Sequence, residues 1–288
     1  MQENAPEVVG FYDEPTGSVQ YVVIDNATKR CAIIDPVLDF DPVAARTGTV
    51  HADAIAAFIR TRELQVEWIL DTHPHADHFS AARYLQSLFD APRAIGSQIT
   101  AVQALWKEIY NFGADFPTDG RQWDRLFDDG DRFTIGSLAG QVMFSPGHTL
   151  ASITYVVGDA AFIHDTLFMP DFGTARADFP GADARTLYHS IEAILALPDE
   201  TRLFTGHDYC PNGRAPRWMA TVAEQKQDNP HLQNMNEQRF VAMREERDAD
   251  LPLPERMLAA LQINTQGGAL PPAESNGQRY LKIPLDQF

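Results

Sequence analysis

Of all segments of this chain, residues 72–78 most restrict the fold and the function that it can have. They read Thr-His-Pro-His-Ala-Asp-His and follow a short apolar segment, 66–70, which is typical of a buried strand. Three imidazoles and a carboxylate therefore fall within six residues, where that strand is expected to end. Neutral imidazole together with carboxylate suits zinc or iron better than calcium or magnesium. A histidine-rich surface loop is the alternative, but three of the nine histidines in the chain lie here, which favours a metal site.

Three other polar motifs also follow predicted strands. Ser-Pro-Gly-His at 145–148 contains a Pro-Gly turn that can present His148 at a strand end. Asp165 comes after the apolar segment 160–163, and a carboxylate that emerges from a buried strand needs a cation or strong hydrogen-bond donors. Gly-His-Asp-Tyr at 206–209 follows a third strand. Taken singly, such a histidine is usually structural and such an aspartate usually caps a turn or helix. The occurrence of all three motifs in one chain favours a shared functional site over three separate structural roles.

The pattern of apolar residues predicts short strands in both halves of the chain, at 19–24, 31–34, 66–70, 132–135, 141–144, 154–157, 161–164 and 202–205. Helical spacing predicts helices at 52–64, 80–89, 98–110, 186–197, 218–228, 237–247 and 254–261. Two halves that mix strands and helices, followed by a helical and irregular tail, indicate an α/β sandwich with a C-terminal extension. Loops at strand ends are where such folds build their sites, and all four polar motifs lie there.

The charge balance limits the partners of this chain. With 23 Lys and Arg against 40 Asp and Glu, the net charge is −17. Such a surface repels nucleic acid and, more weakly, anionic membranes, so we expect neither partner. The only two cysteines, Cys31 and Cys210, are too few for a disulfide framework and favour a reducing compartment. Cys31 lies in an apolar strand and is expected in the core, whereas Cys210 follows the last polar motif and could approach a substrate.

The chain begins without a signal-peptide pattern. It also has no apolar run that approaches the ~18–20 residues of a membrane span. Together with the cysteine content, these features make a cytoplasmic location the expectation.

The four motifs, in this order, resemble those of the metallo-β-lactamase superfamily over roughly residues 17–215. The resemblance implies an αββα sandwich with a metal site between the edges of its two sheets. It divides the chain into a catalytic region, 1–215, and a C-terminal helical extension, 216–288, packed on the same domain. By resemblance, two neighbouring metal positions are implied. The first is surrounded by His73, His75 and His148 and the second by Asp77, His78 and His207, with Asp165 between them.

Two branches of the superfamily share all four motifs: glyoxalase II, a binuclear thioester hydrolase, and the glutathione persulfide dioxygenases, which resemble the ethylmalonic-encephalopathy protein and use one iron and O₂. Gly-Thr-Ala-Arg-Ala-Asp-Phe at 173–179 is similar to the Arg-x-Asp-Phe segment of the dioxygenases, and the Glu-Gly segment of glyoxalases II is missing here. Residues 221–226 and 229–232 are also similar to the dioxygenase branch. The chain departs from it at Thr174 and Ala175, where many members have Cys-Gly. It looks closest to the bacterial Blh-type sulfur dioxygenases.

The dioxygenase resemblance implies one Fe(II) per chain, held by His73, His148 and Asp165 as a face of two histidines and one carboxylate. The reaction that it implies is the oxidation of glutathione persulfide by O₂ to sulfite and glutathione. Four further residues are then expected to act in catalysis by orienting ligands and water: His75, Asp77, His78 and His207. The same four residues could instead hold a second metal ion.

Substrate contacts are predicted from Arg176, whose guanidinium can pair with a carboxylate, and from Tyr209, whose phenol can donate to one. Arg176 could instead form an ion pair with Asp178 inside the chain.

The expected partners are a small-molecule thiol persulfide and O₂, and relatives in this branch suggest a homodimer. Three alternatives stay open: a glyoxalase II-like thioester hydrolase with two zinc or iron ions, a lactonase or β-lactamase, and a non-catalytic scaffold or sensor that shares the fold.

Overall fold

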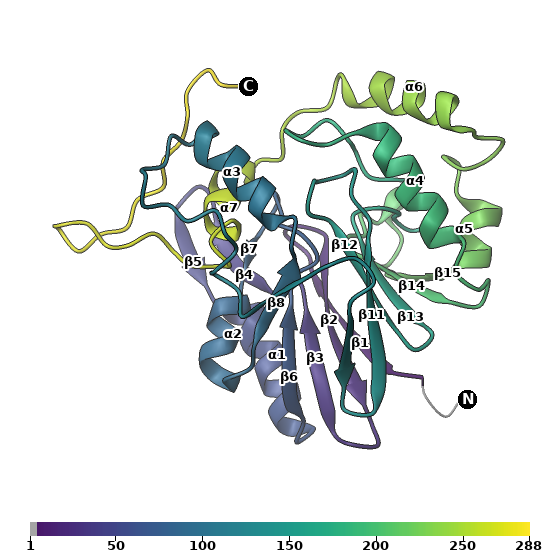
Figure 1. Cartoon of the computed structure of the whole chain (residues 1–288), viewed down its shortest axis with the longest axis horizontal. Helices are drawn as coiled ribbons and strands as arrows, with labels where there is room; N and C mark the ends of the chain where they lie inside the picture. Colours follow the sequence, from purple (N-terminus) through teal and green to yellow (C-terminus); the bar gives the residue numbers. More distant parts are fainter. Residues whose placement is uncertain (1–4) are drawn as a thin grey trace.

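The computed structural model describes residues 5–288. Two six-stranded sheets lie face to face, and helices cover the outer face of each (Figure 1). The first sheet has the strand order β1 (Glu7–Asp13), β2 (Ser18–Asp25), β3 (Arg30–Ile34), β6 (Gln65–Leu70), β8 (Arg93–Gly96) and β9 (Arg125–Phe127). The second has the order β10 (Arg132–Ile135), β11 (Leu138–Phe144), β12 (Ile153–Val157), β13 (Ala160–His164), β14 (Arg202–Thr205) and β15 (Met219–Thr221).

A small three-stranded sheet accompanies these two, in the order β5 (Arg46–Gly48), β4 (Val37–Asp41) and β7 (Phe79–Ser80). The helices of the described chain are α1 (Val50–Thr61), α2 (Ala82–Phe89), α3 (Ile99–Ile109), α4 (Ala184–Leu195), α5 (Val222–Asp228), α6 (Glu237–Asp248) and α7 (Met257–Asn264), with a short 3₁₀ turn at Pro211–Gly213.

Alternation along the strands explains the layers. In β2 the side chains of Val22 and Ile24 pack with Ile55 of α1, whereas Tyr21 faces the opposite way and packs with Phe162 of the second sheet. Successive side chains of a strand point to opposite faces, so a strand covered on both sides is buried along its whole length, as β2 is. Helix α4 covers the outer face of the second sheet through the same kind of apolar contact. The expected αββα sandwich is confirmed.

Parallel strands bring the polar motifs to one edge of the sandwich. In the first sheet β3, β6 and β8 run parallel, and in the second β13 and β14 do. The loops after parallel neighbours leave their sheet at the same edge. Two backbone hydrogen bonds join the sheets there: Ile153 N donates to Thr72 O (3.1 Å), and Val19 N donates to Gly206 O (2.8 Å). The four motifs therefore meet where the two sheets come together.

The predicted strands are confirmed, with ends that shift by three residues at most. The predicted helix at 218–228 is wrong at its start, because residues 219–221 form strand β15. This strand pairs antiparallel with β14 and covers what would otherwise be an open sheet edge. Thr221 then caps α5, where its hydroxyl accepts from the backbone N–H of Glu224. Strands β1, β4, β5, β7, β8 and β9 were not predicted.

Residues 216–288 lie on both sides of the sandwich (Figure 1). Helices α5 and α6 contact α4 on the second sheet, whereas α7 contacts β7, close to the end of the 72–78 segment. The division of the chain at residue 215 stays a prediction. Within residues 5–288, each helix is too short or too polar to cross a membrane.

Candidate metal centre

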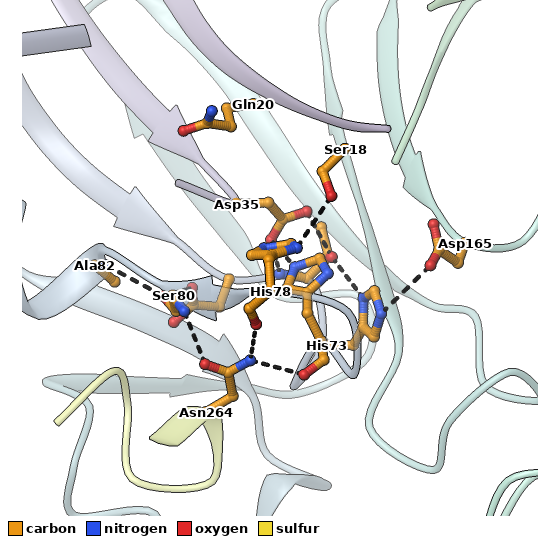
Figure 2. A network of polar contacts seen from close by, with 12 residues as sticks. Ser18, Gln20, Asp35, His73, His78, Ser80, Ala82, Asp165 and Asn264 are labelled. Carbon is orange, nitrogen blue, oxygen red and sulfur yellow. Dashed lines mark hydrogen bonds and ion pairs between the residues drawn. The ribbon is translucent and has the colours of Figure 1, made fainter. Parts of the chain in front are cut away.

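Three side chains of metal-binding type meet at this edge of the sandwich. His73 follows β6, His148 follows β11 and Asp165 follows β13, and one ligand atom from each lies within 4.8 Å of the others. His148 Nε2 lies 3.6 Å from Asp165 Oδ2, and His73 Nε2 lies 3.9 Å from the same oxygen (Figure 2). All three side chains are buried. The structure thus brings together the three predicted ligands, while their binding of a metal stays a prediction.

Hydrogen bonds at the far side of each imidazole leave Nε2 facing Asp165. His73 Nδ1 lies 3.0 Å from Thr72 Oγ1, and this hydroxyl donates its own proton to Asp35 Oδ2 (2.7 Å), so it accepts from His73. His148 Nδ1 donates to the carbonyl oxygen of Arg176 (2.9 Å). Both rings therefore carry their proton on Nδ1 and present an unprotonated Nε2, as metal-binding histidines do.

These residues fit a divalent transition-metal ion. His73 Nε2 is buried and has no hydrogen-bond partner within residues 5–288. Burial lowers the pKa of both His73 and His148, which favours the neutral form that binds metals. Burial would raise the pKa of Asp165, but the neighbouring His207 outweighs this effect and lowers that pKa to about 2. Two neutral imidazoles and an ionised carboxylate are thus directed at one point, a donor set that suits iron(II) or zinc.

A second group of such side chains lies beside the first. His75, Asp77 and His78 each offer a ligand atom within 4.8 Å of the other two. Asp77 Oδ2 also lies 2.8 Å from His207 Nε2. The hydroxyl of Ser18 stands among these residues. Its Oγ is 3.1 Å from His78 Nδ1 (Figure 2), and it also lies 2.8 Å from Asp77 Oδ2 and 3.0 Å from His207 Nε2. A serine hydroxyl therefore occupies the point on which Asp77, His78 and His207 converge.

His207 links the two groups. Its Nδ1 lies 2.6 Å from Asp165 Oδ1, and its Nε2 faces Asp77. Burial would lower the pKa of His207, but the carboxylates around it, Asp165 above all, raise that pKa well above its ordinary value. Asp165 is thus held through one carboxylate oxygen, which leaves the other directed at His73 and His148.

Asp35 is a residue of this site that sequence reasoning missed. It follows β3, accepts hydrogen bonds from the backbone N–H and the hydroxyl of Thr72 (2.7 Å each), and lies 3.1 Å from His75 Nε2. Its sequence signal is the same as that of Asp165, an aspartate directly after an apolar strand. Ser18 carries no such signal, because its position depends on how β2 meets the loop after β14.

A pocket of about 480 Å³ opens over the first group and reaches Asp77, His148, Asp165 and His207. Its wall combines aromatic and cationic side chains: Phe168, Phe172, Phe179, Tyr209, Arg176, Arg244 and Arg247. Such a wall can exclude water from the metal position and offer positive charge to an anionic ligand, although the chain as a whole is acidic.

Both predicted substrate residues line this pocket, but Arg176 already has partners. Its guanidinium makes two hydrogen bonds of 2.6 Å to the carboxylate of Asp178 and a third, of 2.7 Å, to the carbonyl of Pro252. The alternative pairing with Asp178 is therefore present. Tyr209 lies parallel to His207, with 5.5 Å between ring centroids. The roles of Arg176 and Tyr209 toward a substrate stay predictions.

The two cysteines lie outside the pocket wall. Cys31 is buried in the apolar core, as expected. Cys210 is half-buried, with its Sγ 3.6 Å from the Tyr12 hydroxyl.

Comparison with known proteins places this geometry in a family. The family model described as "Metallo-beta-lactamase superfamily" matches residues 14–207. A "Beta-lactamase hydrolase-like protein" of Xylella fastidiosa is 64% identical over 98% of this chain, which spans 65% of that relative's length. "Glyoxylase B2" of Dictyostelium discoideum is 44% identical, with 98% of each chain covered. Human "Persulfide dioxygenase ETHE1, mitochondrial" is 29% identical, with 93% of this chain and 91% of that protein covered.

Among solved structures, the crystal structure of ETHE1 from Myxococcus xanthus superposes with a TM-score of 0.73 at 28% identity, covering 91% of this chain and all of that one. The fold, the order of the motifs and these similarities agree. The chain belongs to the metallo-β-lactamase superfamily.

Proposed function

We propose that this chain is a persulfide dioxygenase that oxidises glutathione persulfide with O₂ at a single iron(II). The similarity to ETHE1 over almost the whole chain supports the dioxygenase branch. The observation that carries the proposal is the position of the Ser18 hydroxyl. It favours one metal ion over two, and metal number separates this reaction from its closest alternative.

The argument from Ser18 rests on space and hydrogen bonds. A binuclear hydrolase needs a second ion to hold the attacking hydroxide. The family resemblance places such an ion among Asp77, His78 and His207, and these three residues surround a hydroxyl at 2.8–3.1 Å. The backbone of Ser18 is fixed, because it pairs with Asp13 in β1 and forms a bridge with His207. A second ion would have to displace this hydroxyl and break three hydrogen bonds.

In this proposal the iron ion and the protein chain would contribute different parts of the chemistry. Bound iron(II) would supply the redox chemistry with O₂. His73, His148 and Asp165 would hold it, and His207 keeps Asp165 oriented. The aromatic wall of the pocket shields the persulfide sulfur from bulk water. In the balanced reaction the terminal sulfur is oxidised and O₂ reduced. Two oxygens of sulfite come from O₂ and one from water, and the S–S bond breaks to release the thiol.

Metal content and oxygen uptake test the proposal together. Anaerobically purified protein is expected to hold about one iron per chain and to consume O₂ when glutathione persulfide is added, with sulfite as product. Iron can be counted by elemental analysis and O₂ uptake followed with an electrode. Two tightly bound ions per chain, hydrolysis of a glutathione thioester and no O₂ uptake would overturn the proposal.

That second result would identify a thioester hydrolase. One relative bears the name "Glyoxylase B2" at 44% identity, and His75, Asp77 and His78 form a second group that could hold an ion. These two observations make it the alternative. Replacement of Ser18 by alanine is informative here, because removal of the hydroxyl should help a second ion to bind.

Substrate binding is the subject of a further prediction. If Arg176 pairs with a carboxylate of glutathione, Arg176→Ala should raise KM for glutathione persulfide about 10- to 100-fold, because a charge-assisted hydrogen bond contributes about 1.5–3 kcal/mol. Iron content should stay unchanged. Steady-state kinetics over a range of persulfide concentrations measures the effect.

Asp178→Asn is the matched control, since it breaks the same ion pair but keeps the guanidinium. Equal rises in KM for both variants would mean that the pair only shapes the loop. An unchanged KM in an iron-loaded Arg176→Ala protein would shift substrate binding to another cation of the pocket, Arg247, because Arg244 is buried and already paired with Asp248.

A further inference from the structure

Asn264, the last residue of α7, is buried against the loop that carries the histidine cluster. Its side-chain Nδ2 donates to the carbonyl oxygens of His75 and His78, at 2.7 Å each, and its Oδ1 accepts from the backbone N–H of Ser80 at 2.8 Å (Figure 2). The residue as a whole is 3% exposed. An asparagine amide has two N–H donors and one carbonyl. Both donors and the carbonyl are therefore used on one short loop.

This loop depends on a distant side chain for its hydrogen bonds. Residues 74–78 have no helix or strand structure, so their backbone groups have no regular partners. A buried carbonyl without a donor costs about 1–3 kcal/mol, and Asn264 supplies donors to two such carbonyls from 186 and 189 residues further along the chain. The loop between β6 and β7 is thus completed by the C-terminal extension.

The residues after Asn264 are fixed in the same place. Gln103 of α3 donates to the carbonyl of Thr265 (2.9 Å), and Arg93 of β8 donates to that of Gly267 (2.6 Å). Gly268 has a φ of +78°, and a Cβ on it would lie 2.6 Å from Ser80 O. Residues 264–268, which we call the C-terminal brace, are therefore packed closely between the histidine loop and the elements beside it.

The histidine loop reaches the first metal group through neighbouring imidazole rings that are tilted against one another. The rings of His73 and His75 have centroids 4.1 Å apart, and those of His75 and His78 are 4.2 Å apart. His78 Nε2 and His75 Nδ1 have no hydrogen-bond partner within residues 5–288. The other nitrogen of each ring has a polar neighbour: His78 Nδ1 lies 3.1 Å from Ser18 Oγ, and His75 Nε2 lies 3.1 Å from Asp35 Oδ1. The rings are therefore positioned by these side chains together with the backbone that Asn264 holds.

We propose that Asn264 is a positioning residue for the metal centre, and that the C-terminal brace sets metal affinity by fixing the backbone of residues 75–80. Asn264 contacts no predicted ligand atom of the first group, since its bonds all go to backbone atoms. Its effect on the metal is exerted through the position of the loop. This inference does not require the dioxygenase reaction, because it concerns metal binding alone.

Metal affinity of purified variants of the whole 288-residue chain tests this inference. Asn264→Ala removes both donors and should weaken Zn²⁺ binding about 10- to 100-fold, the range typical of residues that orient ligands. Asn264→Ser keeps one donor and should fall between alanine and wild type. Competition between the metal-free protein and a chromogenic chelator measures the dissociation constant, and circular dichroism shows that each variant is folded. If Asn264→Ala does not fold, Asn264→Ser against wild type decides the question.

Gln262→Ala is the matched control on the same helix. Gln262 is equally buried, but its amide bonds Leu258 and Lys282 rather than the histidine loop. It should destabilise the fold without changing Zn²⁺ affinity. Wild-type affinity in folded Asn264→Ala, or an equal loss of affinity in Gln262→Ala, would overturn the inference. Neither outcome bears on O₂ uptake, so failure here is distinguishable from failure of the proposed function.

Discussion

Replacement of His148 or Asp165 by alanine is expected to abolish metal retention, whereas wild-type protein should retain about one ion per chain after gel filtration. Each substitution removes one of three donors whose ligand atoms lie within 4.8 Å of one another. The two remaining side chains cannot complete the face that holds the ion. Persulfide oxidation should be lost with the metal. Elemental analysis after anaerobic purification measures the retained ion.

Two further variants make this result specific. His189 is an exposed histidine of α4, paired with Glu192 and Glu237, and His189→Ala should retain the metal. His78→Ala should retain most of the metal and lose activity about 10- to 100-fold, as expected for a residue that orients rather than binds. A metal content that falls from two ions to one in His78→Ala would instead make His78 a ligand of a second ion.

Gly147→Ala is expected to destabilise the fold by about 2–6 kcal/mol and to reduce metal retention. Gly147 has a φ of +129°, which is strained for any other residue, and a Cβ there would lie 2.3 Å from the backbone N and Cα of Leu187 in α4. Backbone strain costs about 1–3 kcal/mol and overpacking about as much again. The total is a large share of a typical free energy of unfolding of about 5–15 kcal/mol. His148 follows directly and should move with the displaced turn.

Urea unfolding of Gly147→Ala and wild type, with iron analysis of the folded fraction, measures both effects. Gly113→Ala is the control, because a Cβ at Gly113 meets no atom within 4 Å and its φ is not positive. It should leave stability and metal content almost unchanged. Wild-type stability in Gly147→Ala would show that the turn before His148 adapts, and that the glycine is not needed to place this histidine.

The sequence alone determined the family and the three candidate metal ligands. Histidine and aspartate directly after apolar strands are local signals, readable because ligand chemistry and strand periodicity both act over a few residues. His73, His148 and Asp165 were predicted to lie together, and their ligand atoms do. The strands that carry them were also predicted, since strands buried on both faces have a strong apolar pattern.

Only the tertiary structure decided how these residues are supported. Ser18 stands among Asp77, His78 and His207, and Asn264 holds the histidine loop from 186 residues away. Strand β15 formed where a helix was expected, and its backbone pairs antiparallel with β14. Arg176 took Asp178 as its partner although its sequence equally favoured a substrate contact. In each case the deciding contacts are hydrogen bonds or ion pairs with groups that the fold brings near, and the spacing of residues along a chain carries no information about such contacts.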